Sequence, residues 1–192
     1  MKRILILVDC QNDFCAEGGA LTSPDSIKVA DRIPNLIRKG KFDAILATMD
    51  THGKNYLNTL EGKYLPVEHC IDATWGYQIR EDIVAAVNSV IEPDKCYAYR
   101  IVKNTFMAPP AIIGGDLIEL VKGDEVYVCG FCTDICVVSN ALLAKAMTAF
   151  KGAEVFVIAD ACNGTSIHNH NAALDVMRSN QIQVVDIDQV IK

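Results

Sequence analysis

The sequence lacks the features that mark nucleic-acid-binding, membrane-spanning and repeat proteins. Its 192 residues carry a net charge of −6 and hold no basic cluster, which argues against nucleic acid or an anionic membrane as a partner. No apolar run approaches the roughly 18 residues that a membrane span needs. The N-terminal segment meets a charged residue too soon for a signal peptide, and no repeat, linker or low-complexity tract interrupts the chain. We therefore expect a cytoplasmic protein.

Cysteine, by contrast, is abundant, with eight residues at positions 10, 15, 70, 96, 129, 132, 136 and 162. They are spread through apolar, strand-like segments, which indicates buried free thiols in a reducing compartment rather than a disulfide framework. Cys129-x-x-Cys132 would suit a redox pair or half of a zinc site, but no second such pair exists. A redox protein would depend on these two thiols, and this alternative stays open.

The order of apolar segments predicts the fold class. The chain is 51% hydrophobic and 22% charged, which suits one compact domain over residues 1–192. Strands are expected at residues 4–8, 44–49, 96–102, 126–129, 154–159 and 183–187, and helices at 26–39 (capped by Ser26 or Asp25), 80–91, 116–121, 132–149 and 166–179. This alternation predicts an α/β fold with three layers (α/β/α) and a six-stranded, mainly parallel sheet.

Cys136 stands at a junction where a nucleophile is expected. The strand over residues 126–129 ends at Gly130, and a helix begins at about Cys132, so Cys136 falls in its first turn. Thr133 and Asp134 would supply acceptors for the unpaired N–H groups of that turn. The helix dipole would lower the pKa of a thiol placed there and favour the thiolate. The alternative is an ordinary buried cysteine.

Two further polar residues are expected to join Cys136. Asp9 and Lys103 each follow a predicted strand, and the carboxyl ends of parallel strands meet at one edge of the sheet, where α/β proteins bind ligands. An aspartate would accept the thiol proton, and a lysine would favour the thiolate. Backbone N–H groups of the 130–136 turn would form an oxyanion hole, completing the machinery for acyl transfer through a thioester. Taken singly, Asp9 would be a turn residue and Lys103 a solvated strand end.

Five motifs then form a pattern along the chain: Asp9-Cys-Gln-Asn-Asp-Phe14, Asp50-Thr-His52, His69-Cys70 with Thr74-Trp-Gly76, Lys103, and Gly130-Phe-Cys-Thr-Asp-Ile-Cys136-Val. With them the chain resembles the isochorismatase-like cysteine hydrolases over nearly its whole length, and most of all their nicotinamidase branch. The resemblance implies that Asp9, Lys103 and Cys136 form a catalytic triad. It also implies a cis peptide between Phe131 and Cys132, with the amides of Cys132 and Cys136 as the oxyanion hole.

The resemblance further implies one divalent metal ion beside the triad. The ligands would be Asp50, His52 and His69 from the long loop over residues 51–76, with Glu61 at a fitting distance for a fourth; relatives with a histidine there have no counterpart in this chain. Such a mixed oxygen and nitrogen site suits zinc, iron or manganese. The alternative is a set of polar residues in a solvated loop. His168 and His170 are interpreted as the polar start of a helix.

The implied reaction is the hydrolysis of nicotinamide to nicotinic acid and ammonia, a step of NAD biosynthesis by pyridine nucleotide salvage. Phe14, Trp75 and Phe131 would contact the flat ring, and Tyr64, Leu65 and Phe106 are further pocket candidates. The alternative is another amide hydrolase of the family that acts on an N-carbamoyl or ureido substrate. Isochorismatase activity is less favoured, because it cleaves a vinyl ether and is linked with an aspartate rather than Cys136. A non-catalytic scaffold would need no intact triad. Apolar helix faces lead us to expect a homo-oligomer.

Overall fold

A six-stranded sheet forms the centre of the protein, as seen in a computed structural model that describes residues 1–93, 95–110 and 119–191. The strands are β1 (Arg3–Val8), β2 (Ala44–Asp50), β3 (Tyr97–Lys103), β4 (Glu125–Phe131), β5 (Glu154–Asn163) and β6 (Gln183–Val185). Their order across the sheet is β3-β2-β1-β4-β5-β6, and each neighbouring pair is parallel. The predicted α/β class and strand number are confirmed.

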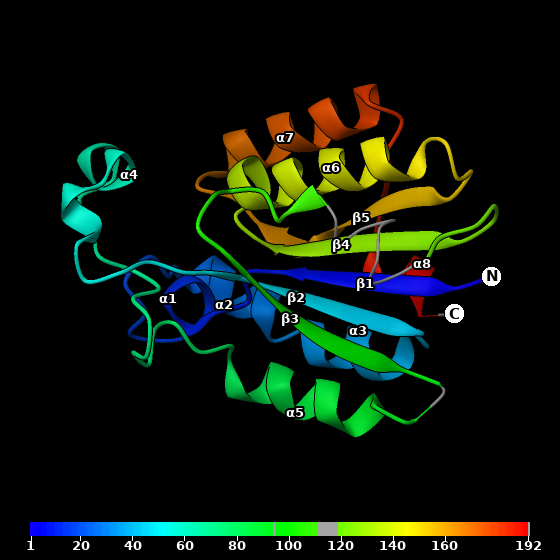
Figure 1. The fold of residues 1–192 in the computed structure, drawn as a ribbon, viewed down its shortest axis with the longest axis horizontal. Helices are drawn as coiled ribbons and strands as arrows, with labels where there is room; N and C mark the ends of the chain where they lie inside the picture. The colour runs from blue at the N-terminus through cyan, green and yellow to red at the C-terminus, as the bar shows by residue number, and fades with distance from the viewer. Residues whose placement is uncertain (94, 111–118, 192) are drawn as a thin grey trace.

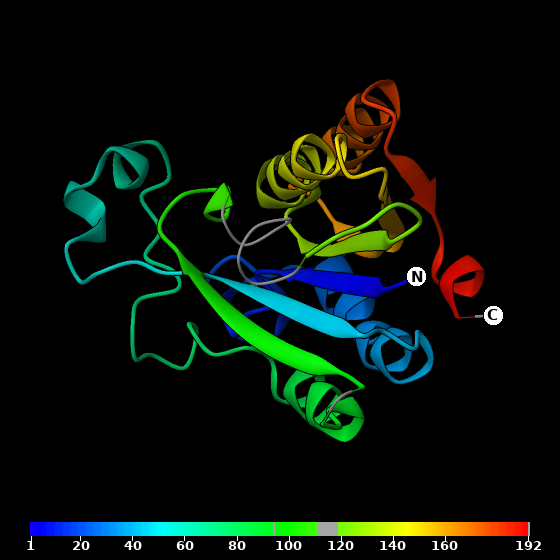
Figure 2. The same ribbon diagram turned by 45° about the vertical axis from the view of Figure 1, so that its right-hand side comes forward.

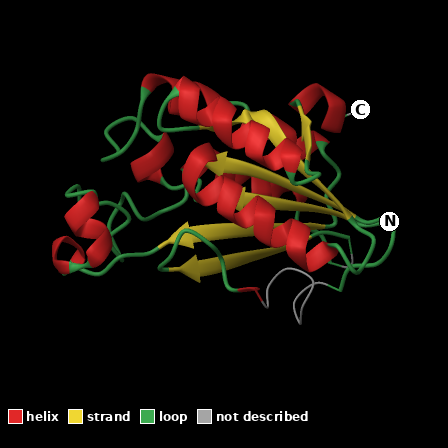
Figure 3. Ribbon diagram, turned by 90° about the horizontal axis from the view of Figure 1, so that it is seen from above, coloured by secondary structure: helices red, strands yellow, loops and turns green. Residues whose placement is uncertain are grey.

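Helices cover the sheet on both faces, which gives the three expected layers (Figure 1). The helices are α1 (Asn12–Cys15), α2 (Pro24–Ala30), α3 (Ile33–Lys39), η1 (Tyr56–Asn58), α4 (Leu60–Tyr64), α5 (Glu81–Val90), η3 (Thr133–Val137), α6 (Val138–Thr148), α7 (Ile167–Ser179) and α8 (Ile187–Val190). The pair α6 and α7 lies over one face, and α3 and α5 pack together on the other (Figures 1 and 3). The sheet is therefore buried on both sides, which explains its long apolar strands.

Burial differs between the centre and the edge of the sheet. Residues 4–8 of β1 and all of β2 are buried, whereas β3 at the edge alternates between exposed and buried positions. This is the pattern expected when a central strand has helices on both faces and an edge strand has only one neighbour. Lys103 ends the edge strand as a buried residue, so its burial must come from the groups around its ammonium.

The long helix expected over residues 26–39 is wrong, because the chain forms α2 and α3 instead. Ser23, rather than Ser26 or Asp25, is the N-cap of α2, and its hydroxyl accepts a hydrogen bond from the Ser26 amide. Pro34 lies in the first turn of α3. Proline has no N–H to continue a helix from the preceding turn and is tolerated only at a helix start. Gly40 is the C-cap of α3, so the helical segment ends at Lys39 as expected.

Several element ends also differ from the sequence expectation. Strand β4 continues through Gly130 to Phe131, and β5 runs four residues beyond Ala159 to Asn163. Gly130 adopts a φ of +130°, and a Cβ there would lie 2.0 Å from the Val8 carbonyl oxygen, so glycine is required for the close approach of β4 to β1. Strand β6 stops at Val185 because Asp186 caps α8.

The helix expected over residues 116–121 falls mainly on positions 116–118, which lie outside the described residues. The long loop after β2 contains η1 and α4, and this arm projects from the carboxyl end of the sheet (Figures 1 and 2). A short parallel bridge between His52 and Ile71 closes its base. Among residues 1–93, 95–110 and 119–191, no helix is both long and apolar enough to cross a membrane.

Candidate active site

The strand order brings Asp9 and Lys103 together although β2 lies between them. Asp50, the last residue of β2, is in register with Lys103, the last residue of β3. The Lys103 Nζ atom lies 2.7 Å from Asp9 Oδ2 and 3.5 Å from Asp50 Oδ1, and the Asp9 and Lys103 side chains are fully buried. Burial alone would lower the pKa of Lys103, but the negative groups around it, Asp9 first, raise the pKa above its usual value. The lysine is therefore a fixed positive charge.

Cys136 completes the predicted group of three residues. It lies in η3, directly after β4, and its Sγ is 3.6 Å from Lys103 Nζ. The peptide bond between Phe131 and Cys132 is cis, as the resemblance implied, and Cys132 is the N-cap of η3. The expectation that Asp9, Lys103 and Cys136 meet at one edge of the sheet is confirmed.

The expected low pKa of the Cys136 thiol is wrong. Burial is the main cause that raises its pKa well above the usual value, and the Asp9 carboxylate raises it further, while Lys103 opposes both. Burial also raises the pKa of Asp9 itself, with Lys103 again opposing. A protonated thiol beside a carboxylate of raised proton affinity can transfer its proton locally, so the geometry favours proton transfer within the site over a standing thiolate.

The Asp9 carboxylate is held by β2 as well as by Lys103. Thr48 Oγ1 donates a 2.6 Å hydrogen bond to Asp9 Oδ1, and the Asp9 amide donates to the Thr48 carbonyl oxygen at 3.2 Å. Thr48 and Asp50 are two residues apart in β2 and thus point to the same side of the sheet. A polar residue within an apolar strand is the signal in the sequence that could have indicated this contact.

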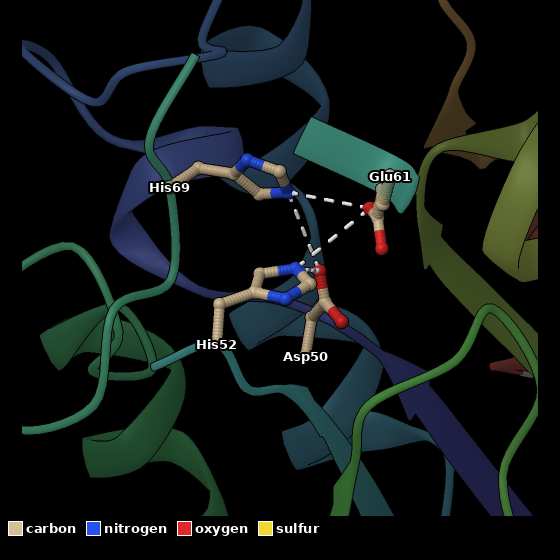
Figure 4. A group of neighbouring side chains, drawn as sticks. All are labelled: Asp50, His52, Glu61 and His69. Carbon is tan, nitrogen blue, oxygen red and sulfur yellow. Dashed lines mark hydrogen bonds and ion pairs between the residues drawn. The ribbon is translucent and has the colours of Figure 1, made fainter. Parts of the chain in front are cut away.

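A second group of side chains lies next to the triad and includes all four predicted ligands (Figure 4). Asp50 Oδ2 lies 3.0 Å from His52 Nε2 and 3.5 Å from His69 Nε2, and Glu61 Oε1 lies 3.8 and 4.0 Å from the same two nitrogens. Ligands at the usual bond lengths of a tetrahedral zinc site would be about 3.4 Å apart. The spacing and the oxygen and nitrogen donors therefore fit one divalent ion.

Neighbouring groups orient the side chains of this cluster and set their charge. The Nδ1 atom of His69 lies 2.8 Å from the Val67 carbonyl oxygen and acts as the donor there, so Nε2 is the ring nitrogen that faces Asp50 and would bind an ion. Burial would raise the pKa of Asp50, but hydrogen bonds from His52 and His69 and the charge of Lys103 outweigh it and lower the pKa. Tyr56 is fully buried against both imidazole rings. The cluster thus presents a carboxylate and two oriented imidazole nitrogens.

Both groups open into one cavity of about 450 Å³. Its wall includes Cys136 together with Asp50, Glu61 and His69. The rest of the wall is formed by Phe14, Leu21, Ser23, Ser26, Tyr64, Leu65, Phe106, Phe131, Cys132, Ile135, Asn163, Gly164 and Thr165. A small molecule in this cavity would meet the thiol and the ligand cluster at the same time.

The sequence matches the family model of the isochorismatase domain over residues 3–189. The chain belongs to the isochorismatase family. Within this family it is 29% identical to the nicotinamidase of Escherichia coli strain K12 over 193 residues, which covers 89% of this chain and 87% of the relative. It is also 29% identical to the nicotinamidase/pyrazinamidase of Mycobacterium tuberculosis over 191 residues, covering 95% and 98%.

Solved structures show the same fold for this isochorismatase-family chain. The crystal structure of the pyrazinamidase of Pyrococcus horikoshii in complex with zinc aligns with a TM-score of 0.69 and 28% identity, covering 97% of this chain and 99% of that one. The nicotinamidase from Bacillus subtilis aligns with a TM-score of 0.73 and 23% identity, over 97% and 100% of the two chains, and shows the fold alone. The similarity therefore extends over the whole family domain.

Phe14, Phe131, Tyr64, Leu65 and Phe106 line the cavity as expected, but Trp75 does not. It is 52% exposed and lies beside a separate surface depression near α5, while its backbone carbonyl accepts a hydrogen bond from the Asn12 side chain. Hydrogen bonds from the Asn12 side chain to the Trp75 carbonyl oxygen and from the Asp13 amide to the Gly76 carbonyl oxygen hold this stretch against α1. The expectation that Trp75 contacts the ligand is therefore corrected.

Thr133 and Asp134 do not cap the first turn in the expected way. Thr133 Oγ1 lies 2.8 Å from His170 Nδ1, and Asp134 Oδ1 accepts a 2.9 Å hydrogen bond from the Thr165 amide. They join η3 to Thr165, between β5 and α7, and to His170 in the first turn of α7. His170 is thus part of this contact rather than a simple polar helix start.

Three buried polar residues position the site although the sequence patterns assign them no role. Gln11 donates to the Asp50 carbonyl oxygen and accepts from the Asp50 amide, both at 2.8 Å. Asp13 accepts a 2.7 Å hydrogen bond from the Cys70 amide, next to His69. Asn140 donates to the Cys136 carbonyl oxygen and accepts from the Ala108 amide. Gln11 and Asp13 lie in the first motif, whereas Asn140 is marked only by being polar four residues after Cys136.

Proposed function

We propose that this protein is a nicotinamidase that hydrolyses nicotinamide to nicotinic acid and ammonia through a cysteine thioester. One observation carries the proposal: a nucleophile and a metal-ligand cluster line a single cavity, and Lys103 lies within 3.6 Å of both Cys136 and Asp50. A pyridinecarboxamide offers a ring nitrogen to the ligand cluster and a carbonyl carbon to the thiol. The relatives named nicotinamidase, which match over most of their length, support the same activity.

The mechanism that we propose begins with proton transfer from Cys136 to Asp9, after which Sγ attacks the carboxamide carbon. The backbone N–H groups of Cys132 and Cys136 stabilise the oxyanion that forms. Asp9 then returns the proton to the nitrogen, the C–N bond breaks and ammonia leaves. Asp9 next takes a proton from a water molecule, whose oxygen attacks the thioester carbon; the C–S bond breaks, nicotinic acid leaves, and the Cys136 thiolate takes the proton back from Asp9. Lys103 stays positive throughout and stabilises the Cys136 thiolate and the Asp9 carboxylate.

Asp50, His52, Glu61 and His69 would hold the divalent ion, and the donor set suits zinc, with iron or manganese as alternatives. The ion would supply a Lewis-acid partner for the pyridine nitrogen. Phe14 and Phe131, both lining the cavity, would flank the ring. This arrangement orients the carboxamide toward Cys136, and orientation of this kind is worth several kcal/mol of the reaction barrier.

The test is ammonia release from a panel of nicotinamide, benzamide and a ureido amide, measured with and without chelator and followed by metal reconstitution. Nicotinamide should be the best substrate, and chelation should remove activity that added zinc restores. Hydrolysis of the ureido amide alone would contradict the nicotinamide proposal and leave the cysteine hydrolase mechanism standing.

We further propose that residues 1–192 act as one isochorismatase-like hydrolase domain in a cytoplasmic, homo-oligomeric enzyme of NAD salvage. Exposed apolar side chains support the oligomer, among them Leu60 and Tyr64 of α4 and Ile167 of α7. Sedimentation velocity of the purified chain measures the oligomeric state directly, and a monomer at micromolar concentration would contradict this part of the proposal.

A further inference from the structure

The segment that follows β3 supplies part of the cavity wall without being part of a helix or a strand. Residues 104–108 leave β3 at Lys103 and run across the carboxyl edge of the sheet toward α6 (Figure 2). Phe106 in this segment lines the cavity, yet the residue is 48% exposed. Packing against the core therefore holds it only in part, and its position depends on how the backbone of the segment is held.

Asn140 of α6 holds the backbone on both sides of Met107. Its Nδ2 atom donates a hydrogen bond to the Phe106 carbonyl oxygen at 3.1 Å, and its Oδ1 atom accepts one from the Ala108 amide at 2.9 Å. In the described parts of the chain, the hydrogen bonds that residues 104–108 make with other elements all go to Asn140. One side chain therefore anchors this part of the wall.

The same amide group also binds the residue that carries the nucleophile. Nδ2 of Asn140 lies 2.8 Å from the Cys136 carbonyl oxygen, one helical turn earlier. A primary amide has two N–H donors, so one donor serves the cavity wall and the other serves Cys136. The backbones of Phe106 and Cys136 are thus linked through a single nitrogen atom.

The burial of Asn140 makes this link specific. The residue is fully buried on the face of α6 that also contains Ala141, Leu143, Ala144 and Thr148. A buried amide is unfavourable unless its hydrogen bonds are made. A shift of residues 106–108 would leave this amide unpaired together with the Phe106 carbonyl and the Ala108 N–H. The contact therefore favours one position of the segment over all others.

We infer that Asn140 is a positioning residue for substrate binding, because it holds Phe106 in the cavity wall before the substrate arrives. The inference rests on the proposed function. A wall that is already ordered contacts the ring without the loss of conformational entropy that a free loop incurs on binding. The reacting groups are held by other contacts, Lys103 by the register of β2 and β3 and Asp9 by Thr48. Loss of the Asn140 amide should therefore raise KM and leave kcat nearly unchanged.

The first experiment measures kcat and KM for nicotinamide in metal-loaded Asn140→Leu protein. Leucine has a similar size and removes both hydrogen-bonding groups. We expect KM to rise by at least about fivefold, while kcat and the alkylation rate of Cys136 by iodoacetamide stay within about threefold of wild type. An unchanged KM, or a fall in kcat as large as the rise in KM, overturns the inference. A wild-type enzyme that does not hydrolyse nicotinamide would instead reject the proposed function.

Thr148→Val is the matched control for the loss of a buried polar group from α6. Thr148 is fully buried in the same helix, and its hydroxyl donates to the Lys145 carbonyl oxygen. This change leaves the contacts of residues 106–108 in place, so KM should stay within about twofold of wild type. A rise in KM equal to that of Asn140→Leu would show a general effect of weakening α6 and would overturn the inference.

A double-mutant cycle tests whether Asn140 acts through Phe106. Phe106→Ala should itself raise KM, because it removes the side chain from the wall. In that background Asn140→Leu should raise KM by less than about twofold more, since the side chain that Asn140 positions is absent. Increases that multiply in the double variant would overturn the inference. If Asn140→Leu protein does not fold, Asn140→Asp takes its place throughout, because it keeps the size and the acceptor for the Ala108 amide and lacks the N–H donors.

Discussion

The two halves of the site are built by different parts of the fold. Asp9 follows β1 and Lys103 ends β3, with β2 between the two strands, and both side chains are fully buried. The distance between them therefore follows from the register of the strands. The ligand cluster depends on the arm between β2 and α5, and its Glu61 side chain remains 25% exposed. The sheet therefore fixes the reacting groups, whereas hydrogen bonds that Gln11 and Asp13 accept from the amides of Asp50 and Cys70 fix the groups that would orient the substrate. A substitution among the reacting residues should leave metal binding unchanged, and a substitution in the ligand cluster should leave the reactivity of Cys136 unchanged.

The largest expected effect is that of Cys136→Ala, which should abolish turnover because Cys136 is the thiol placed beside both Asp9 and Lys103. The melting temperature and the metal content should stay close to wild type, since the ligand cluster does not use the thiol. Activity and elemental analysis on the same sample check both points. Cys129→Ala, which removes one thiol of the Cys-x-x-Cys pair, is the matched control and should keep turnover; loss of turnover there would favour the redox alternative.

Asp9→Asn and Lys103→Met should each lower kcat by more than about 10²-fold, the scale of a lost proton-transfer partner. Their effects on the thiol should have opposite signs. The Asp9 carboxylate raises the pKa of Cys136 and the Lys103 charge lowers it. At pH 7, Asp9→Asn should therefore speed the alkylation of Cys136 by iodoacetamide, and Lys103→Met should slow it. Peptide mapping measures both rates, and changes of the same sign would contradict this electrostatic account.

Removing an imidazole should disrupt the ligand cluster and leave the reacting residues unchanged. His52→Ala and His69→Ala should each lose the divalent ion, about one per chain in the wild type, because an alanine removes one of two nitrogen donors that the carboxylates of the cluster do not replace. Elemental analysis after growth in supplemented medium checks the loss. The alkylation rate of Cys136 should remain within a few-fold of wild type, and a collapse of that rate would show that the two halves are not separable.

The substrate itself gives the next effect in size. Benzamide keeps the ring and the carboxamide but has no ring nitrogen, so it should be hydrolysed about 10²-fold more slowly than nicotinamide if the ligand cluster orients the ring. Pyrazinamide, which keeps a nitrogen at that position, serves as the control and should be cleaved. Steady-state ammonia release gives the three rates, and equal rates for benzamide and nicotinamide would reject orientation by the cluster.

Glu61→Gln should have a smaller effect than each of the preceding active-site substitutions and than the change of substrate. Its carboxylate is the most distant and most exposed member of the cluster, at 3.8 and 4.0 Å from the histidine nitrogens. We expect metal affinity to fall by about tenfold, less than in His52→Ala, because three donors remain. Competition with a chromogenic chelator measures the affinity, and a loss as large as that of the histidine variants would make Glu61 an equal ligand.

Strand periodicity is the part of the sequence that predicted the molecule best. The positions of β1, β3 and β4 can be expected from the sequence to within two residues at each end, so the meeting of Asp9, Lys103 and Cys136 can be expected from the sequence alone. The ligand group followed from the motif resemblance. The polar contacts that hold these residues are less accessible, because Thr48 and Asn140 act through partners 39 and 32 residues away.

Two sequence expectations fail for identifiable reasons. Trp75 is expected in the cavity as an aromatic residue near a ligand histidine, but the path of a loop is set by tertiary contacts that periodicity does not report. A Cβ at Gly76 would fall within 2.3 Å of the Asp13 carboxylate, so the loop must pass close to α1 at this point. A low thiol pKa is expected from the helix start and from Lys103, and burial outweighs these effects.

The position of Glu61 on the arm has a consequence for the chain as a polymer. Asp50 ends β2 and His52 follows it closely, His69 lies in the returning segment of the loop, and Glu61 lies in the helix α4 between them. An ion bound by all four would divide one long loop into two shorter closed loops, much as a cross-link does, and would remove most of the conformational entropy that the free loop retains. Loop length and ion affinity would then be linked. Insertions in the arm should leave the stability of the sheet nearly unchanged and weaken the binding of the ion.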